Sequence, residues 1–222
     1  MGRIILVTGG SRSGKSSWAQ KTAESMSAYR VFIATCPVIV TGNKIDGADG
    51  EADGEIDDEI QERVRKHRAA RDKRNWHTIE EPLDIAKAIA SANDTSSCVK
   101  SAHEGVEYPV VLVDCLTLWI NNLMYRAEKE NAVITEANVV EECRRVINAA
   151  KLHQGSVLFV TNEVGMGIVP ENAQARLFRD LAGRCNQVMA EAGDLVVLMV
   201  CGLPLEVKGT SENPENKTTM FY

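Results

Sequence analysis

Several features that define other classes of protein are scarce in these 222 residues. Aromatic residues make up only 5% of the chain, which weighs against a stacking surface for single-stranded nucleic acid. The net charge is −6, and the only basic cluster, at 63–74, is short, whereas a duplex-binding protein normally presents a basic face. We therefore expect a small anionic ligand and no nucleic-acid partner.

Long apolar runs and paired cysteines are also missing. No stretch reaches the roughly 18–20 apolar residues that a membrane helix needs, so we expect no stable membrane insertion. The apolar stretch 4–8 runs straight into glycines, which favours a buried strand over a secretory signal. The six cysteines contain no CxxC pair and have no regular spacing. We expect reduced thiols in a cytoplasmic protein rather than a disulfide framework.

What the chain does contain is an alternation of apolar, strand-like runs with helix-like stretches. Continuous Val, Ile and Leu runs are typical of strands covered on both faces, as in a parallel sheet. This order predicts an α/β fold with right-handed crossovers, and the tight turn near Gly202 adds an antiparallel edge hairpin. Strands are expected at 4–8, 30–34, 110–114, 156–161, 195–200 and 205–208, and helices at 15–25, 57–70, 83–90, 116–129, 136–152 and 173–192.

The length supports one hydrophobic core, and two domains would be tight. We expect a single domain over residues 1–208. The Gly- and Asp-rich residues 41–55 and the polar residues 92–107 are predicted to be surface insertions. The polar residues 209–222 are predicted to form a flexible tail.

The strongest motif fits G-x-x-x-x-G-K-[ST]. In this pattern glycines let backbone N–H groups surround phosphate oxygens, Lys15 reaches the β- and γ-phosphates, and the Ser16 hydroxyl ligates Mg²⁺. The motif follows a predicted strand and opens a predicted helix, whose positive end faces the same anion. A Gly-rich turn without a ligand is the alternative, but this context favours a site for a purine nucleoside triphosphate. Its residues are Gly9, Gly10, Ser11, Arg12, Ser13, Gly14, Lys15 and Ser16.

The magnesium ion of such a site needs an acidic partner at the end of a buried strand. Asp114 closes the run Val-Val-Leu-Val-Asp and fits this role. The alternative is a helix N-cap for the stretch that starts at Leu116, since Asp is a favoured cap. Because the phosphate loop creates a need for a metal ligand, Asp114 is predicted to bind Mg²⁺.

Residues 56–67 have the pattern of an amphipathic helix with acids in its first turn and bases in its last. His67 lies on the inward stripe, at the basic end. Spacing alone favours a histidine at the edge of the core. The alternative is a nucleophile, because a neutral imidazole can attack phosphorus and carry it as a phosphoramidate.

Four blocks of sequence have to be taken together: 7–16, 33–35, 63–71 with Trp76 and 78–80, and 160–172 with 178–187. The first block matches the pattern Thr-Gly-Gly-x-Arg-Ser-Gly-Lys-Ser of one enzyme family in full. The last block is long and has few substitutions relative to the same family. Together they resemble the bifunctional adenosylcobinamide kinase / adenosylcobinamide-phosphate guanylyltransferases of cobalamin biosynthesis. The resemblance runs from about residue 4 to residue 208.

The resemblance implies a RecA-like sheet with an antiparallel edge, a homotrimer, and a corrinoid substrate. It implies phosphorylation of the aminopropanol hydroxyl of adenosylcobinamide by ATP or GTP. GMP then passes from GTP to a histidine, which falls on His67, and on to the new phosphate, giving adenosyl-GDP-cobinamide. This reverses the interpretation of His67 from spacing alone. The family's guanine-nucleotide contacts outside the loop fall on Ala34, Thr35, Cys36, Arg68, Ala69, Ala70, Arg71, Glu80 and Asp114.

The chain departs from the family pattern at three places. Residues 41–55 separate the second strand from the histidine helix, where family members usually have a few residues. Asp72 stands where the family commonly has Pro, with two further residues before the Trp, and residues 92–107 lengthen the link to the third strand. These differences bear on access to His67 and on the contacts at 68–71.

Asn162 and Glu163 follow the fourth predicted strand, at the carboxyl edge where open α/β sheets bind ligands. One interpretation is that they orient a nucleophile or contact substrate, and the other is a turn network around Gly165 and Gly167. The three tryptophans are expected in the core or an interface rather than stacked on a corrinoid: Trp18, Trp76 and Trp119.

Two other functions are compatible with the motifs. A single-activity small-molecule kinase would use only the γ-phosphate and would leave His67 structural. A nucleotide-dependent switch would hydrolyse slowly and transfer nothing. Such a switch needs a loop that senses the γ-phosphate, and the acidic stretch 41–55 is a poor candidate.

Overall fold

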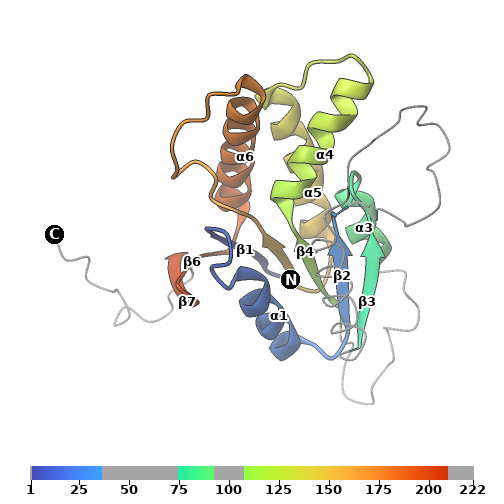
Figure 1. The fold of residues 1–222 in the computed structure, drawn as a ribbon. Helices are drawn as coiled ribbons and strands as arrows, with labels where there is room; N and C mark the ends of the chain where they lie inside the picture. Colours follow the sequence, from blue (N-terminus) through green and yellow to red (C-terminus); the bar gives the residue numbers. More distant parts are fainter. Residues whose placement is uncertain (1, 37–74, 93–107, 210–222) are drawn as a thin grey trace, which may run out of the picture.

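The computed structural model describes residues 2–36, 75–92 and 108–209 (Figure 1). Within these residues seven strands form one sheet in the order β3-β2-β4-β5-β1-β6-β7. Neighbouring strands run parallel except β6 and β7, which form an antiparallel pair at one edge. The strands are β1 (Ile4–Gly9), β2 (Arg30–Ala34), β3 (Trp76–Glu80), β4 (Val110–Asp114), β5 (Val157–Val160), β6 (Leu195–Val200) and β7 (Leu203–Lys208).

Helices cover both faces of this sheet. Side chains alternate along each strand, so Ile4 and Leu6 of β1 face one core while Ile5 and Val7 face the other. Of the described helices, α1 packs on the second core and the other four pack on the first. They are α1 (Lys15–Met26), α3 (Ile85–Ala92), α4 (Leu116–Lys129), α5 (Glu136–Leu152) and α6 (Ala173–Ala192).

This arrangement confirms the predicted RecA-like, mostly parallel sheet with an antiparallel edge. The strands β1, β2, β4 and β6 and the helices α1, α4, α5 and α6 lie where the apolar pattern predicts them, within one residue at each end. The strand predicted at 156–161 is shorter, and the edge strand β7 begins two residues earlier. The helix predicted at 57–70 lies outside the described residues.

Two further differences from the sequence prediction, an additional strand and a longer helix end, have physical reasons. The edge strand β3 was not predicted, because its sequence WHTIE has no continuous apolar run and only Trp76 is buried. Trp76 meets Phe32 of β2 edge to face, with ring centroids 6.1 Å apart. Ala92, predicted as the first residue of an insertion, is instead the buried last residue of α3, so the polar stretch begins after it.

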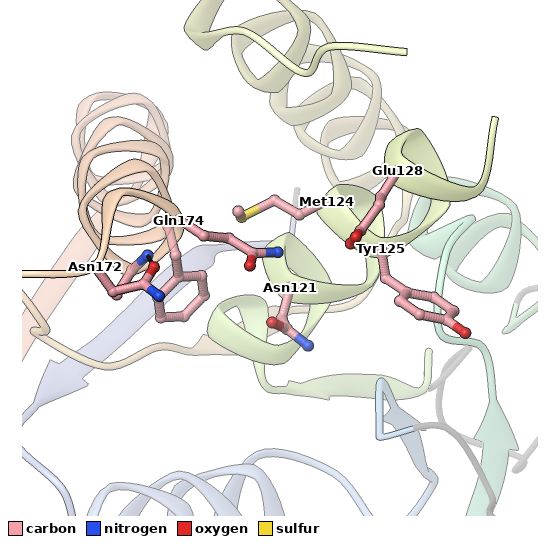
Figure 2. A pocket seen from close by; sticks show the side chains of 8 residues that line it. Asn121, Met124, Tyr125, Glu128, Asn172 and Gln174 are labelled. Carbon is pink, nitrogen blue, oxygen red and sulfur yellow. Dashed lines mark hydrogen bonds between the residues drawn. The ribbon is translucent and has the colours of Figure 1, made fainter. Parts of the chain in front are cut away.

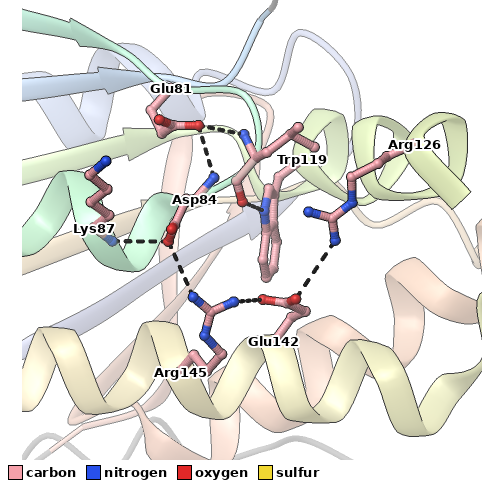
Figure 3. A network of polar contacts seen from close by, with 8 residues as sticks. Glu81, Asp84, Lys87, Trp119, Arg126, Glu142 and Arg145 are labelled. Carbon is pink, nitrogen blue, oxygen red and sulfur yellow. Dashed lines mark hydrogen bonds and ion pairs between the residues drawn. The ribbon is translucent and has the colours of Figure 1, made fainter. Parts of the chain in front are cut away.

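Polar contacts join α3, α4 and α5 around Trp119 (Figure 3). The Trp119 indole is fully buried and donates to Leu83 O at 2.8 Å, which confirms its predicted core position. Arg145 of α5 pairs with Glu142 at 2.7 Å and with Asp84, ahead of α3, at 3.5 Å. These contacts fix α4, whose first residues follow Asp114 at the carboxyl edge of the sheet. No helix in the described ranges is long and apolar enough to cross a membrane.

Candidate nucleotide-binding site

The loop between β1 and α1 has the conformation that its glycines permit. Gly9 has φ of 145° and Gly14 has φ of 95°, both in the region that favours glycine. A Cβ on Gly9 would lie 2.5 Å from Met199 O, and one on Gly14 would lie 3.3 Å from Gly202 Cα. Arg12 also has a left-handed backbone, with φ of 55°. Left-handed non-glycine residues cluster at ligand sites, which is consistent with the predicted loop.

The first turn of α1 keeps its backbone donors available. Its N-cap is Gly14, which has no side chain to accept a hydrogen bond, and the turn contains no acidic residue. The first N–H groups of a helix have no partner within the helix, so they can bind an anion. The loop is also held from the neighbouring strand pair, because Gly202 N, in the β6–β7 turn, donates to Ser13 O at 3.1 Å.

Lys15 is a buried cation at the mouth of this loop. Its side chain is 7% exposed, and Nζ donates to Gly10 O and, at 3.4 Å, to Ser13 Oγ. Burial lowers the pKa of Lys15, and the negative charge of Asp114 partly opposes this shift. Neither hydrogen-bond acceptor carries a charge, so a phosphate here would supply the anion that a buried ammonium group favours.

The predicted nucleotide-binding residues on other strands lie at the same carboxyl edge. In the sheet register, Ala34 of β2 pairs with Glu80 of β3 on one side and Asp114 of β4 on the other. Thr35 is fully buried and exchanges two hydrogen bonds of 2.8 Å with the backbone of Cys115. The structure therefore places Ala34, Glu80 and Asp114 at the ends of adjacent strands, with Thr35 and Cys36 directly after β2.

Asp114 ends β4 as predicted, and α1 packs against that strand. The N-cap of helix α4 is Cys115. The alternative prediction, that Asp114 caps this helix, is therefore wrong. Burial, reinforced by the Asp114 charge, raises the pKa of the Cys115 thiol to about 11. A thiol with a raised pKa stays protonated near pH 7, which weighs against Cys115 as a nucleophile.

The residues present fit a magnesium ion. Asp114 and the Ser16 hydroxyl would supply oxygen ligands, which Mg²⁺ prefers, and a single carboxylate with phosphate oxygens and water is its usual environment in nucleotide sites. Among the described residues no group of three or more His, Cys, Asp or Glu side chains forms a closed metal cage. The donor set therefore suits an ion that arrives with a nucleotide.

A polar network lies behind the loop, between β1, β5, α4 and α6. Glu163 Oε1 accepts from Thr8 Oγ1 at 2.7 Å and from Asn186 Nδ2 at 3.1 Å. Asn186 Oδ1 accepts from Thr161 Oγ1 at 2.7 Å, and Asn162 N donates to Thr117 Oγ1 at 2.7 Å. The hydrogen bonds of Glu163 thus tie it to the strand that carries the loop and to α6. Sequence reasoning missed Thr8 and Asn186 as its partners, because they are 155 and 23 residues away along the chain.

A shallow groove lies between α4 and the start of α6 (Figure 2). Amide side chains dominate its polar lining, and Met124, Tyr125 and Phe178 supply its apolar part. None of the residues predicted to bind nucleotide lines it. The predicted nucleophile and its neighbours, His67, Arg68, Ala69, Ala70 and Arg71, lie outside the described residues.

The strand order and the phosphate loop define the class of protein: a RecA-like α/β domain of the P-loop NTPase type. Residues 5–207 match the family described as cobinamide kinase / cobinamide phosphate guanyltransferase. The chain belongs to this family, whose members are bifunctional enzymes.

Three relatives have the same extent. The bifunctional adenosylcobalamin biosynthesis protein CobP of Pseudomonas aeruginosa is 32% identical over 204 residues, covering 92% of this chain and 96% of its own length. The proteins named CobU from Escherichia coli and Salmonella typhimurium are each 33% identical, covering 92% of this chain and 99% of their own length. The similarity therefore covers nearly the whole length of each relative.

Proposed function

We propose that this chain phosphorylates adenosylcobinamide and then transfers GMP from GTP to adenosylcobinamide phosphate, with His67 as the guanylylated residue. Family membership over residues 5–207 supports the pair of activities. The single structural observation that carries the nucleotide site is the buried Lys15 ammonium group inside a loop held open by Gly9 and Gly14. A histidine nucleophile would serve the second activity by holding GMP between donor and acceptor.

The residues of the site divide the work as follows. Lys15 and the N–H groups of the loop and of the first turn of α1 hold the phosphates and balance the charge that develops on them. Ser16 and Asp114 would hold a magnesium ion, which would neutralise phosphate charge. Ala34, Thr35, Cys36 and Glu80 line the same edge and would contact the nucleoside, as the family resemblance implies.

The covalent step is tested by intact mass. The protein is incubated with Mg²⁺ and GTP beside a His67→Ala variant, and both are analysed before and after acid treatment. An acid-labile adduct of the mass of GMP on the parent alone supports the proposal. Without an adduct on folded, GTP-binding protein, His67 is a structural residue and the chain is a plain kinase. Slow hydrolysis with no transfer to any acceptor would instead identify a nucleotide-dependent switch.

We also propose that the chain assembles as a homotrimer in the cytoplasm. The apolar side chains Leu203, Leu205 and Val207 of β7 are exposed by 71%, 50% and 63%, and β7 is the last strand of its sheet. An exposed apolar edge strand invites pairing with another chain. Light scattering after size exclusion tests this proposal, since a monomer mass at micromolar concentration would overturn it.

A further inference from the structure

The carboxylate of Glu163 is fixed beside the start of the phosphate loop. Its Oε1 accepts the two hydrogen bonds from Thr8 and Asn186, and its backbone N–H donates to Gly9 O at 3.1 Å. Asn186 is itself 8% exposed, and its amide orientation is set by the bond from Thr161. Glu163 Oε2 accepts none of the hydrogen bonds formed by the described residues. The network therefore holds one oxygen and leaves the other available at the carboxyl edge.

Anchoring the loop does not explain why this residue is acidic. The carbonyl oxygen of a glutamine would accept the same two hydrogen bonds without placing a negative charge next to a triphosphate. Like charges repel, so a carboxylate beside the loop that holds a triphosphate would oppose nucleotide binding. A charged group that opposes binding but is held in a partly buried network is explained when the charge takes part in the chemistry.

The two reactions make different demands on a base. In the kinase step the attacking group is an alcohol, whose proton has to leave as the oxygen bonds to phosphorus. In guanylyl transfer the attacking groups are first the unprotonated nitrogen of the His67 imidazole and then a phosphate oxygen, which is already ionised near pH 7. A base beside the phosphate loop would therefore serve the first reaction and not the second.

We propose that Glu163 is the proton acceptor of the kinase step and has no part in guanylyl transfer. This inference rests on the proposed function. The acceptor oxygen bonds to the γ-phosphorus, the bond from that phosphorus to the β,γ-bridging oxygen breaks, and the nucleoside diphosphate leaves. The hydroxyl proton passes to Glu163 Oε2 and from there to solvent. Thr8 and Asn186 are positioning residues, since they act through the carboxylate.

The test is Glu163→Gln, which keeps the size of the side chain and the acceptor for Thr8 and Asn186. Glu171→Gln is the matched control, because Glu171 is an exposed acid in the same β5–α6 connection. Three quantities are measured on the full chain: the rate of adenosylcobinamide phosphorylation, the rate of GMP adduct formation and its discharge by adenosylcobinamide phosphate, and the Kd for GTP. Thermal unfolding shows that each variant is folded.

We expect Glu163→Gln to lower the kinase kcat by roughly 10²–10⁴-fold, the usual contribution of a general base. Adduct formation and discharge should change by less than about tenfold. Equal loss of both activities, or an unchanged kinase rate, would overturn the inference while the proposed function stood. If the parent phosphorylates cobinamide but forms no adduct, the guanylyl half of the proposed function fails, and the kinase rates still decide the role of Glu163. A parent inactive in both reactions would overturn the proposed function and this inference together.

Discussion

Thr8 and Glu163 are joined by a 2.7 Å hydrogen bond between the strand that leads into the phosphate loop and the connection that follows β5. Thr8→Val removes the hydroxyl at nearly constant volume and leaves the carboxylate with one donor fewer. The kinase kcat should fall by roughly tenfold, equivalent to ~1.4 kcal/mol in the barrier. Thr8→Ser, which keeps the hydroxyl, should restore most of that rate. If Thr8→Ser is as slow as Thr8→Val, the hydrogen bond is not what positions Glu163.

Asn186 donates to Glu163 Oε1 and to Asn162 O through one nitrogen, both at 3.1 Å. Asn186→Asp replaces this donor by an acceptor and places a second carboxylate next to Glu163. We expect a loss of roughly 1–3 kcal/mol in the free energy of unfolding, the cost of leaving buried polar groups unsatisfied. Urea denaturation measures it. The control Gln187→Glu makes the same amide-to-acid change one residue along α6 at an exposed position, and it should cost under about 0.5 kcal/mol.

Elements of this structure can be predicted from the sequence where their pattern lies in neighbouring residues, and not where contacts between distant segments decide them. The buried strands β1 and β4 and the helices α4 to α6 follow from continuous apolar runs or a helical period, which are properties of neighbouring residues. The edge strand β3 pairs with only one strand, β2, and its sequence mixes polar and apolar residues. Its pairing with β2 therefore decides its conformation. A local sequence pattern does not predict pairing between strands that are distant in sequence.

The candidate site likewise contains some features that a local motif predicts and others that depend on contacts between distant segments. The phosphate loop from Gly9 to Ser16 is one continuous motif, and its left-handed glycines lie where the motif requires them. Asp114 is predictable because it ends a buried strand. The Thr8–Glu163 contact and the support of Ser13 by the turn at Gly202 are not, because strand order alone places these segments side by side.

Gly14 and Gly10 should respond differently to the same substitution. Gly14 has φ of 95°, a backbone conformation that alanine rarely adopts, whereas a Cβ on Gly10 would meet no atom within 4 Å. Gly14→Ala should lower the free energy of unfolding by roughly 1–2 kcal/mol and weaken GTP binding. Gly10→Ala should leave stability within about 0.5 kcal/mol. Thermal unfolding and GTP titration of both variants check this contrast. Equal stability of the two would contradict the loop geometry.

Lys15 should lower the stability of the nucleotide-free protein and raise the rates of both transfer reactions. Its buried ammonium group bonds only to uncharged oxygens of Gly10 and Ser13, and burial lowers its pKa. Lys15→Met keeps the length of the side chain without the charge. We expect the free energy of unfolding without nucleotide to rise by roughly 0.5–2 kcal/mol. Both transfer rates should fall by roughly 10²–10³-fold, the effect of losing one preorganised cation or donor. A destabilised Lys15→Met variant would show that the ammonium group holds the empty loop together.

His153 should make stability depend on pH. Its side chain is 2% exposed, Nε2 lies 2.7 Å from Pro109 O, and Nδ1 has no hydrogen-bond partner among the described residues. Burial lowers the pKa of His153 below its usual 6.5, and the bond to Pro109 opposes this only in part.

As the pH falls through 6.5, the unfolded chain therefore takes up this proton before the folded protein does. The contribution of His153 to stability is complete above that pH and is lost below it. His153→Gln keeps a donor for Pro109 O but does not titrate, so its urea midpoint should fall less than that of the parent between about pH 7.5 and 5.5. The difference between the two curves isolates His153 from the carboxylates, which both proteins share. Parallel curves would mean that His153 is protonated in the folded protein as readily as in the unfolded chain.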